Sequence, residues 1–165
     1  MAVYGNSGRL GVPPLSDVHT TAQVPLGTIV SGYDSVTNTE GEYFYGKANA
    51  AITVGQICYL NNTNEVLLAD ADTHVNDGGP VGFALTTFAE NDFGWFQISG
   101  KVKAKAGTVA AGGKVMLTST GGTVDDAAVT GGQVLGAEFD TNDGTPAAGF
   151  AYVTCNRPHV QGQIT

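Results

Sequence analysis

The chain has 165 residues, the length of one ordinary domain, and its 15 acidic and 7 basic side chains give a formal charge of −8. That charge repels nucleic-acid phosphates and anionic lipid headgroups, so neither a nucleic acid nor a membrane is an expected partner. Only 13% of the residues are charged and 24 are glycine, a composition that favours turns and strands over helices.

The first forty residues differ from the rest of the chain. Isolated apolar side chains are mixed there with Gly, Pro, Ser and Thr, and no helical or strand period is sustained. The pair Pro13-Pro14 forces a locally extended backbone. Such a segment buries little against itself, so residues 1–40 are predicted to form an extended arm that becomes ordered on another protein surface. A mobile tail is the alternative.

From residue 42 onward, short runs rich in aromatic and β-branched residues are separated by turn residues. The expected strands are 42–48, 56–60, 65–69, 81–87, 94–99, 102–106, 114–118, 133–139 and 149–155. Turn signals lie at Asn61-Asn62, Asp77-Gly78, Gly121-Gly122, Gly131-Gly132 and Asp143-Gly144. One short helix is expected at 125–129. The predicted class is all-β, with residues 41–157 as the body and 158–165 as a C-terminal tail.

One predicted strand has an alternating pattern of charge. Lys101, Lys103 and Lys105 are separated by small apolar residues, which places three ammonium groups on one face and the core-facing residues on the other. Lysine on an outer strand discourages pairing with stray chains. The pattern therefore predicts an edge or solvated strand.

The two halves of the body follow the same order of segments. In the first half, Gly46-Lys47-Ala48 is followed by the apolar strand 54–60 and the glycine-marked strand 79–84. In the second half the corresponding segments are 100–102, 112–117 and 132–137. Two similar hairpin units that close each other's edges make a small β-barrel or sandwich, which is the predicted architecture.

Two fragments resemble phosphate-binding loops without meeting their requirements. Residues 41–48 have the glycine and lysine spacing, but Ala48 replaces the hydroxyl that would hold magnesium, and the residues between the glycines favour a strand. Residues 107–114 carry an extra glycine and fail on spacing. No nucleotide site is predicted at either place.

Other polar residues also form no recognisable site. Residues 140–144 resemble the start of a calcium loop, but no glutamate closes it, and a hairpin turn explains the pattern equally well. Asp70, Asp72 and Asp77 make a second acidic loop, with weak calcium binding as the alternative to a solvated turn. The three histidines, His19, His74 and His159, lie far apart in sequence.

The cysteines are interpreted as small buried apolar residues, because neither Cys58 nor Cys155 has a partner at metal-ligand spacing. Cys155 and His159 form a conceivable thiol and base, but Pro158 separates them and no third group orients the pair. The protein is accordingly predicted not to be an enzyme, with no catalytic, cofactor-binding or metal-binding residue. The chain lacks the pattern of a secretory signal, so synthesis in a cytoplasm is expected.

Aromatic residues gather on two predicted strands. Tyr43 and Tyr45 share a face opposite Phe44, and a second strand carries Phe93, Trp95 and Phe96. Exposed rings stack on sugars or bases, whereas most such residues fill a core or a subunit interface. Core or interface is the preferred interpretation.

Several glycine- and alanine-rich phrases point to a family. They are Gly46-Lys47-Ala48-Asn49-Ala50-Ala51-Ile52-Thr53-Val54-Gly55-Gln56-Ile57, Gly79-Pro80-Val81-Gly82-Phe83-Ala84, Gly100-Lys101-Val102 and Ala110-Ala111-Gly112-Gly113-Lys114-Val115. Over residues 42–155 the chain resembles the head-decoration, or cement, proteins of tailed bacteriophages. The resemblance implies a compact β-barrel-like domain, often trimeric, on the outside of the expanded head.

The resemblance also supplies the expected function. The chain would decorate and stabilise the outer surface of a phage capsid in the virion by bridging subunits of the major capsid protein, after synthesis in the host cytoplasm. The major capsid protein and further copies of the chain, as a homotrimer, would be its partners. The predicted capsid-contacting residues are the unpaired apolar residues of the arm, Val3, Tyr4, Leu10, Val12, Pro13, Pro14 and Leu15. The alternative is a head-fibre or adhesin module that binds glycans or a host receptor through an exposed Trp95 and the tyrosines.

Overall fold

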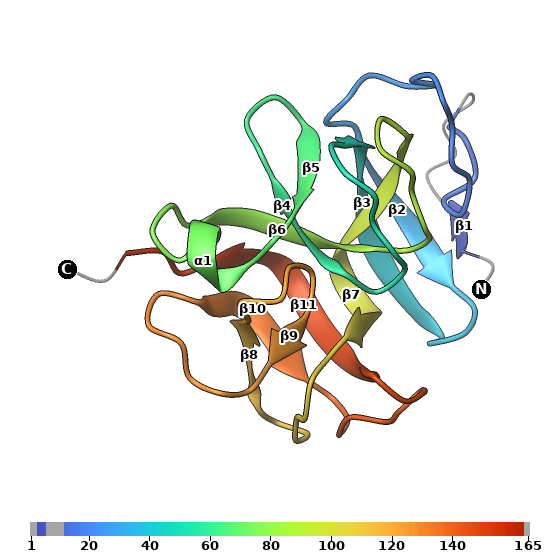
Figure 1. The fold of residues 1–165 in the computed structure, drawn as a ribbon. Helices are drawn as coiled ribbons and strands as arrows, with labels where there is room; N and C mark the ends of the chain where they lie inside the picture. Colours follow the sequence, from blue (N-terminus) through green and yellow to red (C-terminus); the bar gives the residue numbers. More distant parts are fainter. Residues whose placement is uncertain (1–2, 6–11, 164–165) are drawn as a thin grey trace.

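The computed structural model describes residues 3–5 and 12–163 (Figure 1). Those residues form one 11-stranded sheet and one short helix, which confirms the all-β class. The elements are β1 (Val3–Gly5), β2 (Ile29–Asp34), β3 (Thr39–Ala48), β4 (Ile57–Leu60), β5 (Glu65–Leu68), α1 (Ala71–His74), β6 (Gly79–Ala84), β7 (Phe93–Lys105), β8 (Lys114–Leu117), β9 (Val124–Asp125), β10 (Gln133–Phe139) and β11 (Phe150–Val160).

Five strands close on themselves to make a first barrel. Their order is β3, β5, β4, β6 and β7, and β3 also pairs with β7. The pairing of β3 with β7 is antiparallel over residues 42–47 and 93–99, and a short parallel pairing of β3 with β5 at Ala48 and Val66 closes the ring. The inward side chains form one hydrophobic cluster of Ala48, Ile52, Cys58, Leu60, Val66, Ala84, Phe88, Phe96 and Ile98.

The long strand β7 continues into a second barrel with β11, β10, β8 and β9. A parallel bridge between Ala106 and Val124 closes it, as the parallel β3 and β5 pair closes the first barrel. Its interior belongs to a cluster that includes Val102, Val115, Leu117, Phe139 and Val153. Because β7 serves both barrels, the two are joined by a common wall (Figure 1).

The two barrels are built by corresponding backbone hydrogen bonds. The N–H of Gln56 donates to the carbonyl of Thr53 at 3.2 Å, and in the second barrel the N–H of Gly113 donates to the carbonyl of Ala110 at 3.0 Å. Likewise the N–H of Ala84 donates to the carbonyl of Gln56 at 3.0 Å, and that of Phe139 donates to the carbonyl of Gly113 at 3.1 Å. Each pair occupies the same place in its barrel, at the start of β4 or β8 and the end of β6 or β10. The predicted architecture of two similar hairpin units is therefore confirmed.

Residues 12–28, called the strap below, lie against the outer face of the first barrel. The backbones of His19 and Phe93 exchange hydrogen bonds of 2.9 and 2.7 Å. The N–H of Gln23 donates to the hydroxyl of Tyr45 at 3.1 Å. A third hydrophobic cluster, which contains Leu15 and Trp95, joins the strap to the sheet.

Strand pairing extends past both expected ends of the body. β2 lies within residues 1–40 and pairs along its whole length with β3, because Val30 turns inward to the third cluster. At the other end β11 runs to Val160, where it pairs with Gly79. Part of the expected arm and part of the expected tail thus belong to the sheet.

Two local predictions are wrong. Residues 94–99 and 102–106 are parts of one continuous strand, since Gly100 takes a φ of +97° that lets the chain bend without a break. Lys101, Lys103 and Lys105 are partly exposed and alternate with buried residues as expected, and this part of β7 pairs with β11. The helix expected at 125–129 is absent, because Asp125 ends β9 and its carboxylate accepts the N–H of Ala127 at 3.0 Å in a turn.

The helix that the described residues do contain is α1, which follows one of the acidic loops. The carboxylate of Asp70 caps its start by accepting the N–H of Thr73 at 2.7 Å. With four residues it falls far short of a membrane-crossing helix, and no other helix is present in the described part of the chain.

Candidate interaction surfaces

The fragments that resemble catalytic motifs are built into the fold. Residues 41–48 belong to β3, so their glycines and Lys47 form an extended strand, which cannot wrap a phosphate. Cys155 is buried, and its burial raises the thiol pKa to about 12, so the nucleophilic thiolate is not formed near neutral pH. His159 is exposed, beyond an irregularity of β11 at Arg157.

The acidic turns use their oxygens for backbone support. The carboxylate of Asp143 accepts the N–H of Val109 at 3.1 Å, and the side-chain carbonyl of Asn142 accepts that of Ala111 at 2.9 Å. Among residues 12–163, no group of three or more His, Cys, Asp or Glu side chains is arranged to hold a metal ion.

The aromatic residues of β3 and β7 lie in the core. Tyr43, Tyr45 and Trp95 are each 0% exposed and belong to the cluster under the strap. Tyr45 and Trp95 meet edge to face, with ring centroids 4.9 Å apart. The glycan-binding alternative needed these rings on an exposed face, so its predicted site is wrong.

Within residues 12–163, three polar atoms of these rings and of the strap are buried without a hydrogen bond. The hydroxyl of Tyr43, the indole N–H of Trp95 and Nδ1 of His19 are buried without a hydrogen-bond partner among the described residues. Burial is also the main cause that raises the pKa of Tyr43. An unmet buried polar atom costs about 1–3 kcal/mol, so the packing under the strap is less favourable than its apolar contacts suggest.

The predicted capsid-contacting residues fall into four groups. Leu15 is 0% exposed and packs against the cluster of Tyr45 and Trp95, so it belongs to the core and is not available to a partner. Pro14 is exposed, while Pro13 and Val12 are half-buried on the strap. Val3 and Tyr4 lie in β1, whose backbone pairs with β2, and Leu10 lies outside the described residues.

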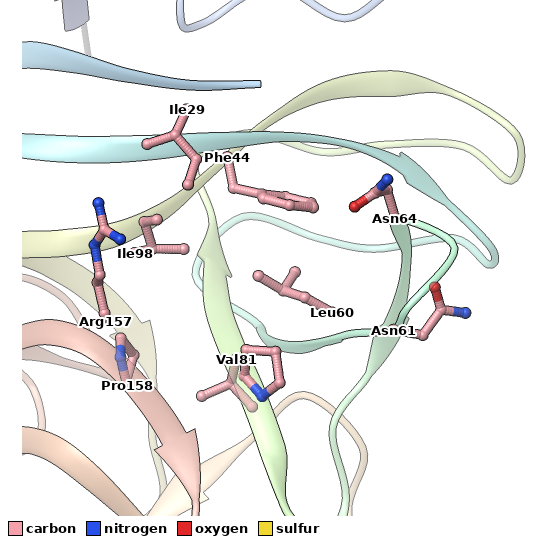
Figure 2. Close-up of a pocket in the computed structure, with 10 residues that line it drawn as sticks. Ile29, Phe44, Leu60, Asn61, Asn64, Val81, Ile98, Arg157 and Pro158 are labelled. Carbon is pink, nitrogen blue, oxygen red and sulfur yellow. The ribbon is translucent and has the colours of Figure 1, made fainter. Parts of the chain in front are cut away.

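An apolar groove opens at one end of the first barrel (Figure 2). Its cavity volume is about 290 Å³, and Figure 2 shows side chains from several strands and from the β4 to β5 turn around the hollow. The lining comprises Ile29, Phe44, Leu60, Asn61, Asn64, Pro80, Val81, Ile98, Arg157 and Pro158. Sequence reasoning missed this groove, because its walls come from strands that are distant in the chain.

A bidentate ion pair lies at the rim of the groove. Nε and Nη2 of Arg157 donate to the two carboxylate oxygens of Glu42 at 3.0 and 2.9 Å. This hydrogen bonding holds the pKa of Glu42 below its ordinary value and raises that of Arg157. Arg157 therefore contributes little free positive charge to the groove.

No protein-family model matches the chain, and no curated protein sequence matches it either.

The outer face of the second barrel differs from that of the first. The ammonium of Lys101 lies 5.1 Å from the ring centroid of Tyr152, and that of Lys103 lies 4.5 Å from that of Phe150. Lys101 also pairs with Asp140 at 3.2 Å. All of these side chains are partly exposed, so this is a polar, solvated wall with most of its charge engaged inside the molecule.

Proposed function

We propose that the chain is a structural virion protein that decorates the outside of a phage capsid and stabilises it by bridging subunits of the major capsid protein. The observation that supports this proposal most is the combination of an acidic double barrel with an open apolar groove. Cys58 and Cys155 are buried, and the carboxylates of Asp70 and Asp143 accept backbone N–H groups in turns. Binding to protein is the activity that such a surface favours.

The double barrel suits a clamp that must resist tension. A pull on one barrel is passed to the other through β7, which pairs with β3 on one side and with β6 and β11 on the other. Load is thereby shared over many backbone hydrogen bonds. Each such bond contributes about 0.5–1.5 kcal/mol, so distributing the pull keeps any one of them from failing alone.

The charge of the chain suits a position outside the shell. At −8 the protein is repelled by packaged nucleic acid. The same charge keeps free oligomers from aggregating until a capsid presents its sites, and many copies acting at once supply the stabilisation. In this proposal the outward part of the strap, Pro13 and Pro14 with Val12, contacts the capsid together with Val3, Tyr4 and Leu10.

Co-sedimentation with expanded capsids of the phage that encodes the chain tests this function. Wild-type protein is expected to pellet with expanded capsids at a saturable ratio to the major capsid protein and to remain in solution with unexpanded ones. A variant that lacks residues 1–11 keeps Leu15 and is expected to stay folded but to bind far more weakly. Lys114→Ala, which removes an exposed ion pair with Glu138 on the second barrel, is the matched control and should bind normally. Equal binding by the truncated variant contradicts the role of the arm, and no binding by the wild type contradicts the function.

A further inference from the structure

The turn between β2 and β3 carries an apolar side chain at its tip. Val36 is 56% exposed, more than any other bulky apolar side chain in the described part of the chain. The turn lies at the lower right margin of the molecule in Figure 1. Exposure of one valine is ordinary, so its meaning depends on how firmly it is held and on what surface would receive it.

The tip is held by a buried carboxylate. Asp34 is 2% exposed, and its two oxygens accept the N–H of Val36 at 2.8 Å and the hydroxyl of Thr37 at 2.9 Å. The side chains of Tyr33 and Asn38 are hydrogen-bonded across the same turn. A knob fixed in this way loses little conformational entropy when it docks, which favours binding.

The receiving surface is the apolar groove at the other end of the same hairpin. Ile29 begins β2 and lines the groove, whereas the tip follows Asp34 at the end of β2. At about 3.3 Å per residue, roughly 16 Å of strand separates Ile29 from Asp34. A chain therefore does not fill its own groove with its own tip.

The size and charge of the two surfaces match. The groove volume of about 290 Å³ lies at the lower limit of small-molecule pockets and also accommodates one or two apolar side chains. Residues 35–38 carry no charge, and Arg157, the charged residue of the lining, is neutralised by Glu42. For two copies that each carry −8, a contact through uncharged surfaces adds the least repulsion.

We propose that the Val36 tip of one copy inserts into the groove of a second copy. Because every copy has one tip and one groove at opposite ends of a hairpin, the contact is head-to-tail, and copies that repeat it form a ring where the rotation between them closes and a filament where it does not. The inference rests on the homotrimer that is expected together with the proposed function, and it adds the two surfaces that meet. It does not depend on binding to a capsid.

Light scattering of the purified full chain tests the contact. The wild type is expected to be oligomeric at about 0.1 mM, a concentration at which contacts of moderate strength form. Val36→Asp and Ile29→Asp should each weaken association at least about 10-fold, because a carboxylate would be buried without a partner. Val18→Asp is the matched control, since Val18 is 37% and Ile29 38% exposed, and it should associate normally. Circular dichroism of each variant should show the wild-type fold.

Mixing the two defective variants separates a head-to-tail contact from a symmetric one. Val36→Asp retains a groove and Ile29→Asp retains a tip, so the mixture should form a 1:1 complex and nothing larger. Oxidation of a Val36→Cys, Asn61→Cys variant should link copies by a disulfide, because the native Cys58 and Cys155 are buried. A Val18→Cys, Asn61→Cys variant should remain unlinked.

Three results would overturn the proposal. They are a wild type that is monomeric up to about 1 mM, a mixture that forms no complex, or association that survives both Val36→Asp and Ile29→Asp. Loss of capsid binding by these variants together with a monomeric wild type would assign the groove to a capsid subunit, which also overturns it. If the two variants form the 1:1 complex on mixing and the wild-type oligomer does not bind capsids, this inference stands and the proposed function is refuted.

Discussion

The two barrels have the same hydrogen-bonded plan, but their ends and walls differ. The second barrel is closed at one end by the outer wall of the first, because Ile57, Val81 and Phe83 belong to the cluster that fills it. The corresponding end of the first barrel is the open groove beside Phe44 and Leu60. Duplication of a unit thus leaves one barrel covered and the other with an apolar end that is free to receive a partner.

The outer walls show the same asymmetry. On the first barrel Tyr43, Tyr45 and Trp95 are covered by the strap. On the second barrel the corresponding positions of β7 and β11 carry Lys101, Lys103 and Tyr152, which remain partly exposed. A wall that has no strap needs side chains that tolerate water, and lysine over an aromatic ring meets that need.

The largest expected effect is on the joint between the barrels. Phe83→Ala should lower the free energy of unfolding by about 3–5 kcal/mol, because Phe83 is fully buried where the two barrels meet. Denaturation followed by tryptophan fluorescence and by circular dichroism should give coincident transitions, since β7 couples the barrels. Two separate transitions would mean that the barrels unfold independently.

Leu15→Ala should destabilise the protein by about 2–4 kcal/mol, within the range for buried leucines, because the strap would lose its fully buried anchor. The sequence has a single tryptophan, Trp95, under the strap. Its emission should therefore shift to longer wavelength in this variant. Unchanged emission and stability would show that the strap does not cover the first barrel in solution.

Gly55 and Gly112 occupy equivalent turns of the two barrels and allow a matched comparison. Both have a positive φ, +83° and +80°. A Cβ at Gly55 would lie 2.9 Å from the ring of Phe150, whereas one at Gly112 meets nothing within 4 Å. Gly112→Ala should cost about 1 kcal/mol from backbone strain, and Gly55→Ala about 1–2 kcal/mol more. Equal costs in thermal unfolding would contradict the close packing between the barrels at Gly55.

The smallest expected effect concerns the ion pair at the groove. The folded-state pKa of Glu42 is lowered by Arg157, so its contribution to stability is present above the unfolded pKa and is lost as the pH falls through the folded value. Glu42→Gln should therefore reduce the melting temperature slightly at pH 7, and this difference should shrink as the pH falls through the folded pKa. A difference that does not change on acidification would show that the effect does not come from the charge.

Much of this fold was predictable from local patterns, and the parts that were not depend on distant contacts. Alternating apolar residues located most strands, and the repeated glycine phrases indicated the two units. The parallel closures at Ala48 with Val66 and at Ala106 with Val124 join segments whose sequences give no sign of pairing. Leu15 stands alone among polar residues and prolines, so no period revealed that it is buried.

The candidate surfaces were less predictable than the fold for the same reason. The groove is assembled by β2, β3, β4, β6, β7 and β11 together with the turn at Asn61 and Asn64, and no single segment has a pattern of its own. Val36 resembles any apolar turn residue until the buried Asp34 beneath it is known. The lysines of β7, in contrast, were placed on the correct face by simple alternation.

The most direct test of the account is the amount and position of the chain in purified virions. Quantitative mass spectrometry should find it at a fixed ratio to the major capsid protein, and protease or antibody added to intact particles should reach it. Its absence from virions, or its presence only inside sealed particles, would contradict a role as an outer clamp.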